Sequence, residues 1–125
     1  MTYHSFFLKA LMLSAVMALP GLTLADSVKP KTGWMVNEHG MALYTYAKDT
    51  RNKSNCNDQC AKNWPPMKAE STNKSAGDWT VITRDDNQMQ WAYKGKPLYT
   101  YVKDKKPEDT KGHGAGKGAW KVAKQ

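Results

Sequence analysis

The most constraining feature of this 125-residue chain is a ten-residue segment that occurs in two similar copies. GMALYTYAKD covers residues 40–49, and GKPLYTYVKD covers residues 95–104. In both copies the side chains alternate in character, which is typical of a β-strand with two different faces. A chain that carries the same strand twice is expected to build its fold from two related halves.

The second copy is the return strand of a predicted hairpin. Residues 88–93 and 96–102 flank Lys94–Gly95, and two short runs joined by two residues with Gly in second place are typical of a β-hairpin. Counting outward from this turn places Trp91 opposite Leu98. We therefore expect these two side chains to share one face of the hairpin.

The same count places Met89 opposite Thr100 one step farther along. The first copy follows a longer turn at residues 37–40, and counting outward from it places Trp34 opposite Leu43. A turn that is longer by two residues leaves the strand parity unchanged, so each side chain keeps its face. The two copies are therefore predicted to form hairpins of the same kind.

Each copy also ends on a similar short run, Gly77–Val81 in the first and Gly118–Val122 in the second. If Trp79 is the counterpart of Trp120, the first copy is longer than the second by about the length of residues 54–67. This predicts that residues 54–67 are an insertion carried by one half only.

These patterns predict an all-β fold, a small antiparallel domain built from two duplicated hairpin units, with roughly six short strands. The repeats are expected at about residues 33–82 and 88–123, with a short helical insertion near Cys56–Lys62. Beyond residue 25 the chain has no Phe, and its large apolar groups are mainly Trp, Tyr and Met. Indole and phenol groups need hydrogen-bond partners, which suits a thin sheet structure better than a helical bundle.

Residues 1–25 have the pattern of a secretory signal peptide. Lys9 precedes an apolar run at residues 10–19, and Pro20–Gly21 ends that run. Thr23 and Ala25 then supply small side chains at positions −3 and −1 of a cleavage site. A membrane anchor or a buried N-terminal helix is the alternative, but the apolar run is too short to span a bilayer. We expect a mature single domain of residues 26–125, periplasmic or secreted, with no transmembrane segment.

The chain is basic, with a formal net charge of +8. Such a charge favours an anionic envelope component or a small acidic ligand as the partner. Nucleic acid is not expected, because an exported protein rarely meets it and Lys105–Lys106 is the only adjacent basic pair. Dispersed charge also keeps a protein soluble, which is the simpler explanation of the basic composition.

Three sequence elements carry a family resemblance. Tyr-x-aromatic-x-x-Asp occurs at residues 44–49 and 99–104, Cys-x3-Cys-Ala-x-x-Trp-Pro-Pro at residues 56–66, and QWAYKGKPLY at residues 90–99. Together they resemble the bacterial family of secreted repeats and predicted lipoproteins named for the Tyr-x-aromatic-x-x-Asp motif, over roughly residues 33–123. The resemblance implies export and duplication but no particular reaction. The residue directly after the predicted cleavage site is Asp26, so that position has no Cys to carry a lipid.

The motif supplies the binding candidates, two tyrosines and one aspartate from each copy: Tyr44, Tyr46, Asp49, Tyr99, Tyr101 and Asp104. By strand parity, the four tyrosines share a face turned away from the Trp–Leu face. Either they pack beneath a second layer, or they form an exposed aromatic platform that would be a binding surface.

Asp49 and Asp104 end the two motif strands. They are either a pair of catalytic or metal-binding carboxylates or two structural acceptors. Because each copy places one Asp at the same position, duplication explains the pair without catalysis. We expect each Asp to accept a backbone N–H of the next turn or a Tyr hydroxyl.

Cys56 and Cys60 are expected to form a disulfide, the default for two cysteines in an exported protein. The alternative is a copper or zinc site, or a thiol redox pair, built from His39, Cys56, Cys60 and His113. His113 lies in the basic, Gly-rich run 111–118, which is either a cradle for an anion or a flexible connection.

The sequence contains no Gly-x-Ser-x-Gly elbow, and it suggests no Ser-His-Asp or Cys-His arrangement. We expect no enzymatic activity and no cofactor. The predicted function is that of an exported, non-catalytic envelope protein that binds a ligand or partner through its Tyr-rich face and basic rim. Metal handling or thiol redox chemistry in the periplasm is the alternative.

Overall fold

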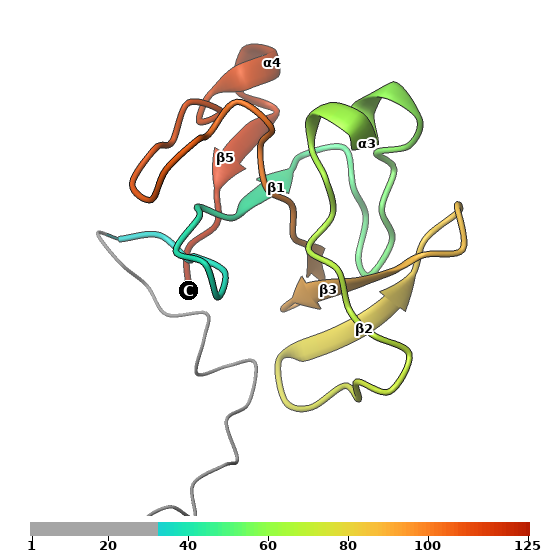
Figure 1. Cartoon of the computed structure of the whole chain (residues 1–125). Coiled ribbons are helices and arrows are strands. Elements are labelled where there is room, and N and C mark those ends of the chain that lie inside the picture. The colour runs from blue at the N-terminus through green and yellow to red at the C-terminus, as the bar shows by residue number, and fades with distance from the viewer. Residues whose placement is uncertain (1–32) are drawn as a thin grey trace, which may run out of the picture.

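A computed structural model describes residues 33–125, so the expected signal peptide lies outside the described residues. The strands form two small antiparallel sheets, one of order β1-β5 and one of order β2-β3-β4 (Figure 1). The expected all-β class is confirmed. In chain order the elements are β1 (Tyr44–Tyr46), α3 (Gln59–Asn63), β2 (Trp79–Thr83), β3 (Met89–Tyr93), β4 (Lys96–Pro97), α4 (Ala115–Gly118) and β5 (Trp120–Val122).

The predicted Lys94–Gly95 turn joins β3 to β4. Both residues have positive φ, 51° and 84°, the conformation that a two-residue hairpin turn of type I′ requires. The N–H of Leu98 donates to the carbonyl of Trp91 at 3.0 Å, so the expected pairing of these two residues is confirmed. Both side chains are buried.

The hairpin opens beyond Leu98, and the expected pair of Met89 with Thr100 is wrong. The carbonyl of Met89 accepts the N–H of Ala69 at 3.1 Å, while the N–H of Thr100 donates to Pro65 at 2.8 Å. The segment 65–69 therefore lies between the two strands and pairs with both. A long-range segment takes the hydrogen bonds that counting from the turn assigned to the hairpin.

The expected pair of Trp34 with Leu43 is also wrong, by one residue. The N–H of Leu43 donates to the carbonyl of Met35 at 3.0 Å, and Met35 is fully buried. The turn closes with the side chain of Asn37, whose Oδ1 accepts the N–H of Met41 at 3.0 Å. The shift by one residue reverses the expected faces, so Met35 takes the place in the core predicted for Trp34.

The two copies meet at Tyr44 and Tyr99. The N–H of Tyr44 donates to the carbonyl of Tyr99 at 2.8 Å, and the N–H of Tyr99 donates back at 3.0 Å. Because the same residue of each copy forms both bonds, the copies are related by an approximate two-fold axis at this point.

The same two-fold relation shows which residues of the two copies are equivalent. The N–H of Met35 donates to Ala123 at 2.8 Å, and the N–H of Trp91 donates to Met67 at 2.9 Å. Ala123 in turn donates to Leu43, and Met67 donates to the equivalent Leu98, both at 2.8 Å. Residues 64–67 are thus the counterpart of residues 120–123.

The counterpart of Trp120 is therefore Trp64, and the expected match with Trp79 is wrong. The short helix expected near Cys56–Lys62 is present as α3, but α4 precedes Trp120 as α3 precedes Trp64. Both helices lie at the same end of the molecule, at the top of Figure 1. Residues 54–67 consequently belong to the repeat and are not an insertion.

The copies exchange strands. Strand β1 of the first half pairs with β5 of the second, and the extended residues 98–100 of the second half pair with residues 65–67 of the first. Each half completes the sheet of the other, and two buried clusters result: Met35, Leu43, Met67, Trp91, Leu98 and Ala123, and Ala42, Tyr44, Cys56, Trp64, Tyr99 and Trp120. Within residues 33–125, no helix is long and apolar enough to cross a membrane.

Candidate functional site

The motif tyrosines and aspartates form two hydrogen bonds between the copies, one buried and one half-buried. The hydroxyl of Tyr44 donates to Oδ2 of Asp104, and the hydroxyl of Tyr99 donates to Oδ2 of Asp49, both at 2.7 Å. The other carboxylate oxygens are also occupied, since Asp49 accepts the N–H of Asn55 at 2.7 Å and Asp104 accepts that of Lys111 at 2.9 Å. The expectation that each Asp accepts a Tyr hydroxyl or a turn N–H is confirmed.

Burial sets the protonation of this pair of contacts. Desolvation raises the pKa of the Tyr44 and Tyr99 hydroxyls above their ordinary value, and the neighbouring aspartates raise it further. Desolvation also raises the pKa of Asp49, although hydrogen bonds from Asn55 and Tyr99 oppose this. At neutral pH the tyrosines stay protonated and act as donors in these contacts.

The tyrosines do not form an exposed platform. Tyr44 and Tyr99 are 0 % exposed, and Tyr46 and Tyr101 are half-buried. The proposed Tyr-rich binding face is therefore wrong. Strand parity placed the four side chains together, but a single sequence did not show that each half covers the face of the other.

The second aromatic of the motif lies at the end of a stack of four rings. Tyr46 stacks on Trp120 with ring centroids 4.2 Å apart, and Trp120 stacks on Trp64 at 3.9 Å. Trp64 then stacks on Tyr101 at 4.0 Å. Tyr46 and Tyr101 are equivalent, as are the two tryptophans, so the two-fold axis passes between the indoles.

Every residue named by the motif thus contacts the other copy: the first Tyr by its hydroxyl, the second aromatic by its ring and the Asp by its carboxylate. Sequence reasoning missed Trp64 and Trp120 as partners of the motif. The available signal was the arrangement of both tryptophans after a short run with two cysteines or two glycines, Cys56 and Cys60 or Gly112 and Gly116.

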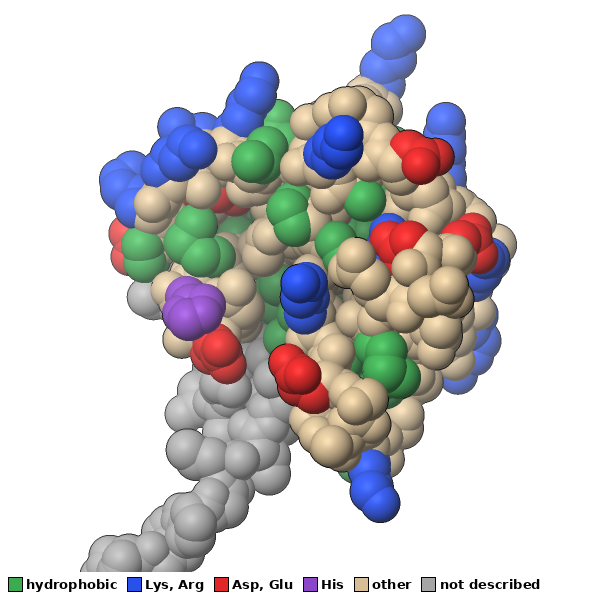
Figure 2. Space-filling view, turned by 45° about the vertical axis from the view of Figure 1, so that its right-hand side comes forward, with side chains coloured by type: hydrophobic (Ala, Val, Ile, Leu, Met, Phe, Trp, Pro, Cys, Tyr) green, Lys and Arg blue, Asp and Glu red, His purple; other side chains and the backbone are tan. Residues whose placement is uncertain are grey.

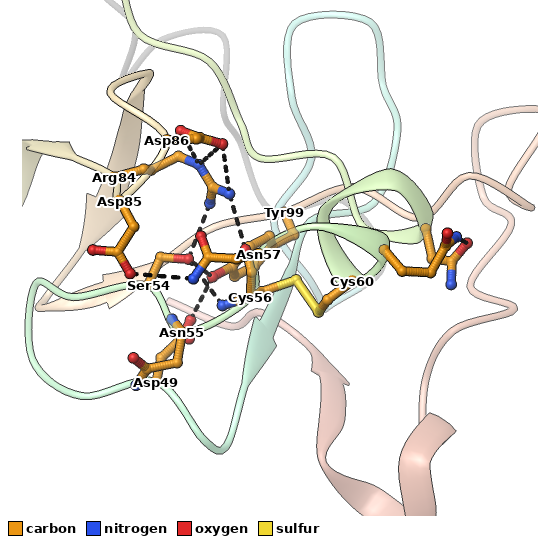
Figure 3. The surroundings of a disulfide bond; sticks show 12 residues. Asp49, Ser54, Asn55, Cys56, Asn57, Cys60, Arg84, Asp85, Asp86 and Tyr99 are labelled. Atoms are coloured by element: carbon orange, nitrogen blue, oxygen red, sulfur yellow. Dashed lines mark hydrogen bonds and ion pairs between the residues drawn. A yellow bond between two sulfur atoms is a disulfide. The ribbon is translucent and has the colours of Figure 1, made fainter.

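The expected disulfide between Cys56 and Cys60 is present, with the two Cα atoms 5.2 Å apart. Beside it lies Arg84, whose side chain is fully buried (Figure 3). The guanidinium donates to the carbonyl of Cys56 at 2.9 Å and to Oγ of Ser54 at 3.0 Å. Ser54 Oγ lies 2.7 Å from the Tyr99 hydroxyl, so the disulfide loop is joined to the motif.

We expect the double variant Cys56→Ser/Cys60→Ser to lose about 2 kcal/mol of unfolding free energy, because the bond closes only a short loop of the unfolded chain. Urea denaturation followed by tryptophan fluorescence measures this. A reductant should shift the wild-type curve by a similar amount and leave that of the double variant in place. An unchanged wild-type curve in reductant would contradict the prediction.

The structure does not assemble the alternative metal site. Cys56 and Cys60 are bonded to each other, and residues 33–125 contain no group of three or more His, Cys, Asp or Glu side chains placed to hold a metal. His39 is exposed, with Nε2 3.4 Å from a carboxylate oxygen of Glu38. Nδ1 of His113 accepts the N–H of Val122 at 3.1 Å.

Two adjoining cavities lie where β1 and β5 face the Lys94–Gly95 turn and β4. The first has a volume of about 470 Å³ and the second about 490 Å³. Both are lined by Thr45, Lys94, Lys96 and Lys121, so we treat them together as the basic groove. Arg51 adds a cation to the first cavity and Lys124 adds one to the second.

The loop that follows β1 builds one wall of the basic groove. The N–H of Asn52 donates to the carbonyl of Gly95 at 2.8 Å, which ties this loop to the β3–β4 turn. A Cβ on Gly95 would lie 2.8 Å from a guanidinium nitrogen of Arg51, so the glycine allows that side chain to cross the turn. Among residues 33–125, Asp49 is the single acidic residue that lines the first cavity.

The cations of the basic groove are exposed and not neutralised by neighbours. Among residues 33–125, the ion pairs join His39 to Glu38, Lys53 to Asp85, Arg84 to Asp86 and Lys106 to Asp109, and none includes a groove lysine or Arg51. Figure 2 shows basic side chains projecting at several places around the visible face. The groove differs from them because its cations converge on one concave space.

Comparison with protein families shows to which family the chain belongs. The profile of a family described as a secreted repeat of unknown function matches residues 27–68 and 80–124. The chain belongs to this secreted-repeat family. Searches of curated proteins and of solved structures find no match.

The bounds of the two secreted repeats follow the hydrogen-bond pattern. The first match ends one residue after Met67 and the second one residue after the equivalent Ala123. These bounds differ from the expected repeats at residues 33–82 and 88–123, because those rested on the match of Trp79 with Trp120. Strand β2 opens the second repeat instead of closing the first.

The two-fold relation of the secreted repeats also shows that the basic groove belongs to one side only. At the equivalent place on the other side, Met41 stands where the groove has Lys96, and Pro65 stands where it has Lys121. Lys106, the equivalent of Arg51, forms an ion pair with Asp109 at 2.8 Å and holds the pKa of that carboxyl at about 2. Two of the groove lysines therefore have uncharged counterparts across the two-fold axis.

Proposed function

We propose that this secreted-repeat protein is a non-catalytic binding module of the cell envelope, and that its basic groove binds an anionic envelope component. Four exposed cations that line one concave space make a local positive potential, and concave low-dielectric walls strengthen it. The unpaired cations of the groove are the observation that carries the proposal. Periplasmic or secreted location after export agrees with a partner of this kind.

The non-catalytic assignment is supported by the state of the motif. Asp49 and Asp104 are each occupied by a Tyr hydroxyl and a backbone N–H. Catalytic carboxylates need free access to the reacting atoms; the Asp104 carboxylate is buried, and both oxygens of the half-buried Asp49 already accept hydrogen bonds. We therefore place the function of the protein in the groove and the function of the motif in joining the repeats.

The triple variant Lys94→Gln/Lys96→Gln/Lys121→Gln is expected to bind dextran sulfate at least about ten-fold more weakly than the wild type. Loss of three cations near an anionic surface removes on the order of 1 kcal/mol each, and the groove holds all three. Isothermal titration calorimetry at physiological salt measures the affinity. Since these side chains are exposed, circular dichroism should show an unchanged fold.

A matched control separates the groove from net charge. Lys62→Gln/Lys74→Gln/Lys103→Gln removes the same charge from exposed positions outside both cavity linings. We expect this control to retain the affinity within about two-fold, since distant surface charges are screened at physiological salt. Equal losses in the two triple variants would show that net charge alone drives binding and would refute the proposed groove site.

A further inference from the structure

The basic groove is larger than a single anionic group. A water molecule takes up about 30 Å³ of liquid, so a cavity of about 470 Å³ has room for roughly fifteen. One phosphate, sulfate or carboxylate would leave most of that volume to solvent. The second cavity adjoins the first, since Thr45, Lys94, Lys96 and Lys121 line both. An extended ligand fits this arrangement better than a monoatomic or tetrahedral anion.

Each cavity also has an aromatic wall. Tyr46 lines the first cavity and Tyr93 lines the second, and both are half-buried. Tyr46 is held by its stack on Trp120, with the ring planes 12° apart, so its orientation is fixed before any ligand arrives. A ligand that meets the Tyr46 ring and the groove lysines at once carries both an apolar ring face and negative charges.

A membrane surface does not match this combination. An anionic bilayer contacts the side chains that project farthest, whereas these lysines line two concave spaces together with the half-buried Tyr46 and Tyr93. A linear chain of sugar rings with carboxylate or phosphate groups presents an apolar C–H face to an aromatic ring and its charges to lysines. Its repeating units allow it to occupy both cavities.

We infer that the ligand of the basic groove is a linear anionic polysaccharide, with a sugar ring stacked on Tyr46 and acidic groups paired with Lys94, Lys96 and Lys121. This inference rests on the proposed function, because it names the class of anion that the groove binds. Arg51 and Lys124 then lie at the two ends of the bound segment, since each lines only one of the cavities.

Oligomers of galacturonic acid test the inference with the full mature chain. Affinity for the monomer, a tetramer and an octamer is measured by calorimetry, beside polyphosphate of the same charge as the octamer. We expect the octamer to bind at least about ten-fold more tightly than the monomer, because only a chain reaches both cavities. It should also bind more tightly than polyphosphate, which has no ring to stack.

A symmetry-matched pair of variants isolates the aromatic contact. Tyr46→Leu should weaken octamer binding about five-fold, the range of one aromatic stacking contact. Tyr101→Leu removes the equivalent ring at the other end of the same stack, 4.0 Å from Trp64, and should leave binding within about two-fold. Thermal melting of both variants checks that their losses of stability are alike.

The outcomes distinguish the inferred polysaccharide ligand from the proposed binding of anions in general. Equal affinity for the octamer and polyphosphate, with Tyr46→Leu no different from Tyr101→Leu, would overturn the polysaccharide and leave anion binding standing. Tight binding only to vesicles containing anionic lipid would likewise overturn it in favour of a membrane surface. Binding of no anion in a groove-dependent manner would overturn both the inference and the proposed function.

Discussion

Replacing Trp120 by alanine is expected to remove about 3–5 kcal/mol of unfolding free energy, the usual cost of deleting a large buried aromatic side chain. Trp120 is 5 % exposed and lies between two rings of the stack, with Trp64 on one face and Tyr46 on the other. Its removal leaves a cavity at the contact between the repeats, where neither half can close the gap alone. Urea denaturation measured by far-UV circular dichroism gives the loss.

Two further variants keep this prediction testable if Trp120→Ala does not fold. Trp120→Phe keeps an aromatic ring in the stack and should cost about 1–2 kcal/mol, so that a folded protein is available for measurement. Trp64→Ala should match Trp120→Ala, because the two-fold axis relates the indoles. A loss below about 1 kcal/mol in Trp120→Ala would show that the stack contributes little to the joining of the repeats.

Replacing Arg84 by methionine is expected to cost about 3 kcal/mol, although methionine is apolar and of similar length. The guanidinium donates to Ser54 Oγ and to Oε1 of Gln90, both at 3.0 Å, and to the carbonyl of Cys56. Methionine leaves these three buried acceptors with a missing donor. The lost hydrogen bonds outweigh the gain from no longer burying a charge, because the three acceptors stay buried.

Variants of the ion pair show which contacts of Arg84 matter. Asp86→Asn removes the charge of the carboxylate that pairs with Arg84 at 3.1 Å; its side chain is 39 % exposed, so we expect a loss below about 1 kcal/mol. Arg84→Lys keeps the charge but cannot reach the three acceptors in a planar fork, and it should fall between the other two variants. If Asp86→Asn cost as much as Arg84→Met, the ion pair and not the buried hydrogen-bond network would carry the stability.

The exchange of contacts between the repeats gives the motif a physical meaning. Tyr44 binds Asp104 and Tyr99 binds Asp49, so one repeat alone leaves both its Tyr and its Asp without a partner. The motif is therefore a joining device that needs two copies. The residues around the motif are free to differ between the halves, and the lysines that line the basic groove beside Tyr46 and Asp49 are such a difference.

Local patterns predicted much of this protein. Alternation and a Lys94–Gly95 turn were sufficient for the β3–β4 hairpin, because a two-residue turn fixes the register of the strands that flank it. The disulfide followed from the spacing of Cys56 and Cys60 and from export. The structural role of Asp49 and Asp104 followed from duplication, since a residue that repeats with its surroundings needs no separate catalytic explanation.

The register of the first hairpin and the match of the repeats were beyond local patterns. Counting from the turn placed Trp34 in the core, but the Asn37 side chain closes that turn and brings Met35 there instead. Two Trp residues in similar short runs, Trp79 and Trp64, competed as the counterpart of Trp120. Only the hydrogen bonds of Met67 and Ala123 distinguish between them.

The amino-acid sequence by itself determined that two related β-rich halves exist, where the β3–β4 hairpin turns and which cysteines pair. These features depend on residues close together in the chain, whose spacing is visible in the sequence. Only the tertiary structure decided that Tyr44 and Tyr99 are buried, that the motif joins one half to the other, and that Lys94, Lys96 and Lys121 surround one groove. Those features depend on which strand of one half pairs with which strand of the other, and strand exchange brings together residues whose separation in the chain carries no such information.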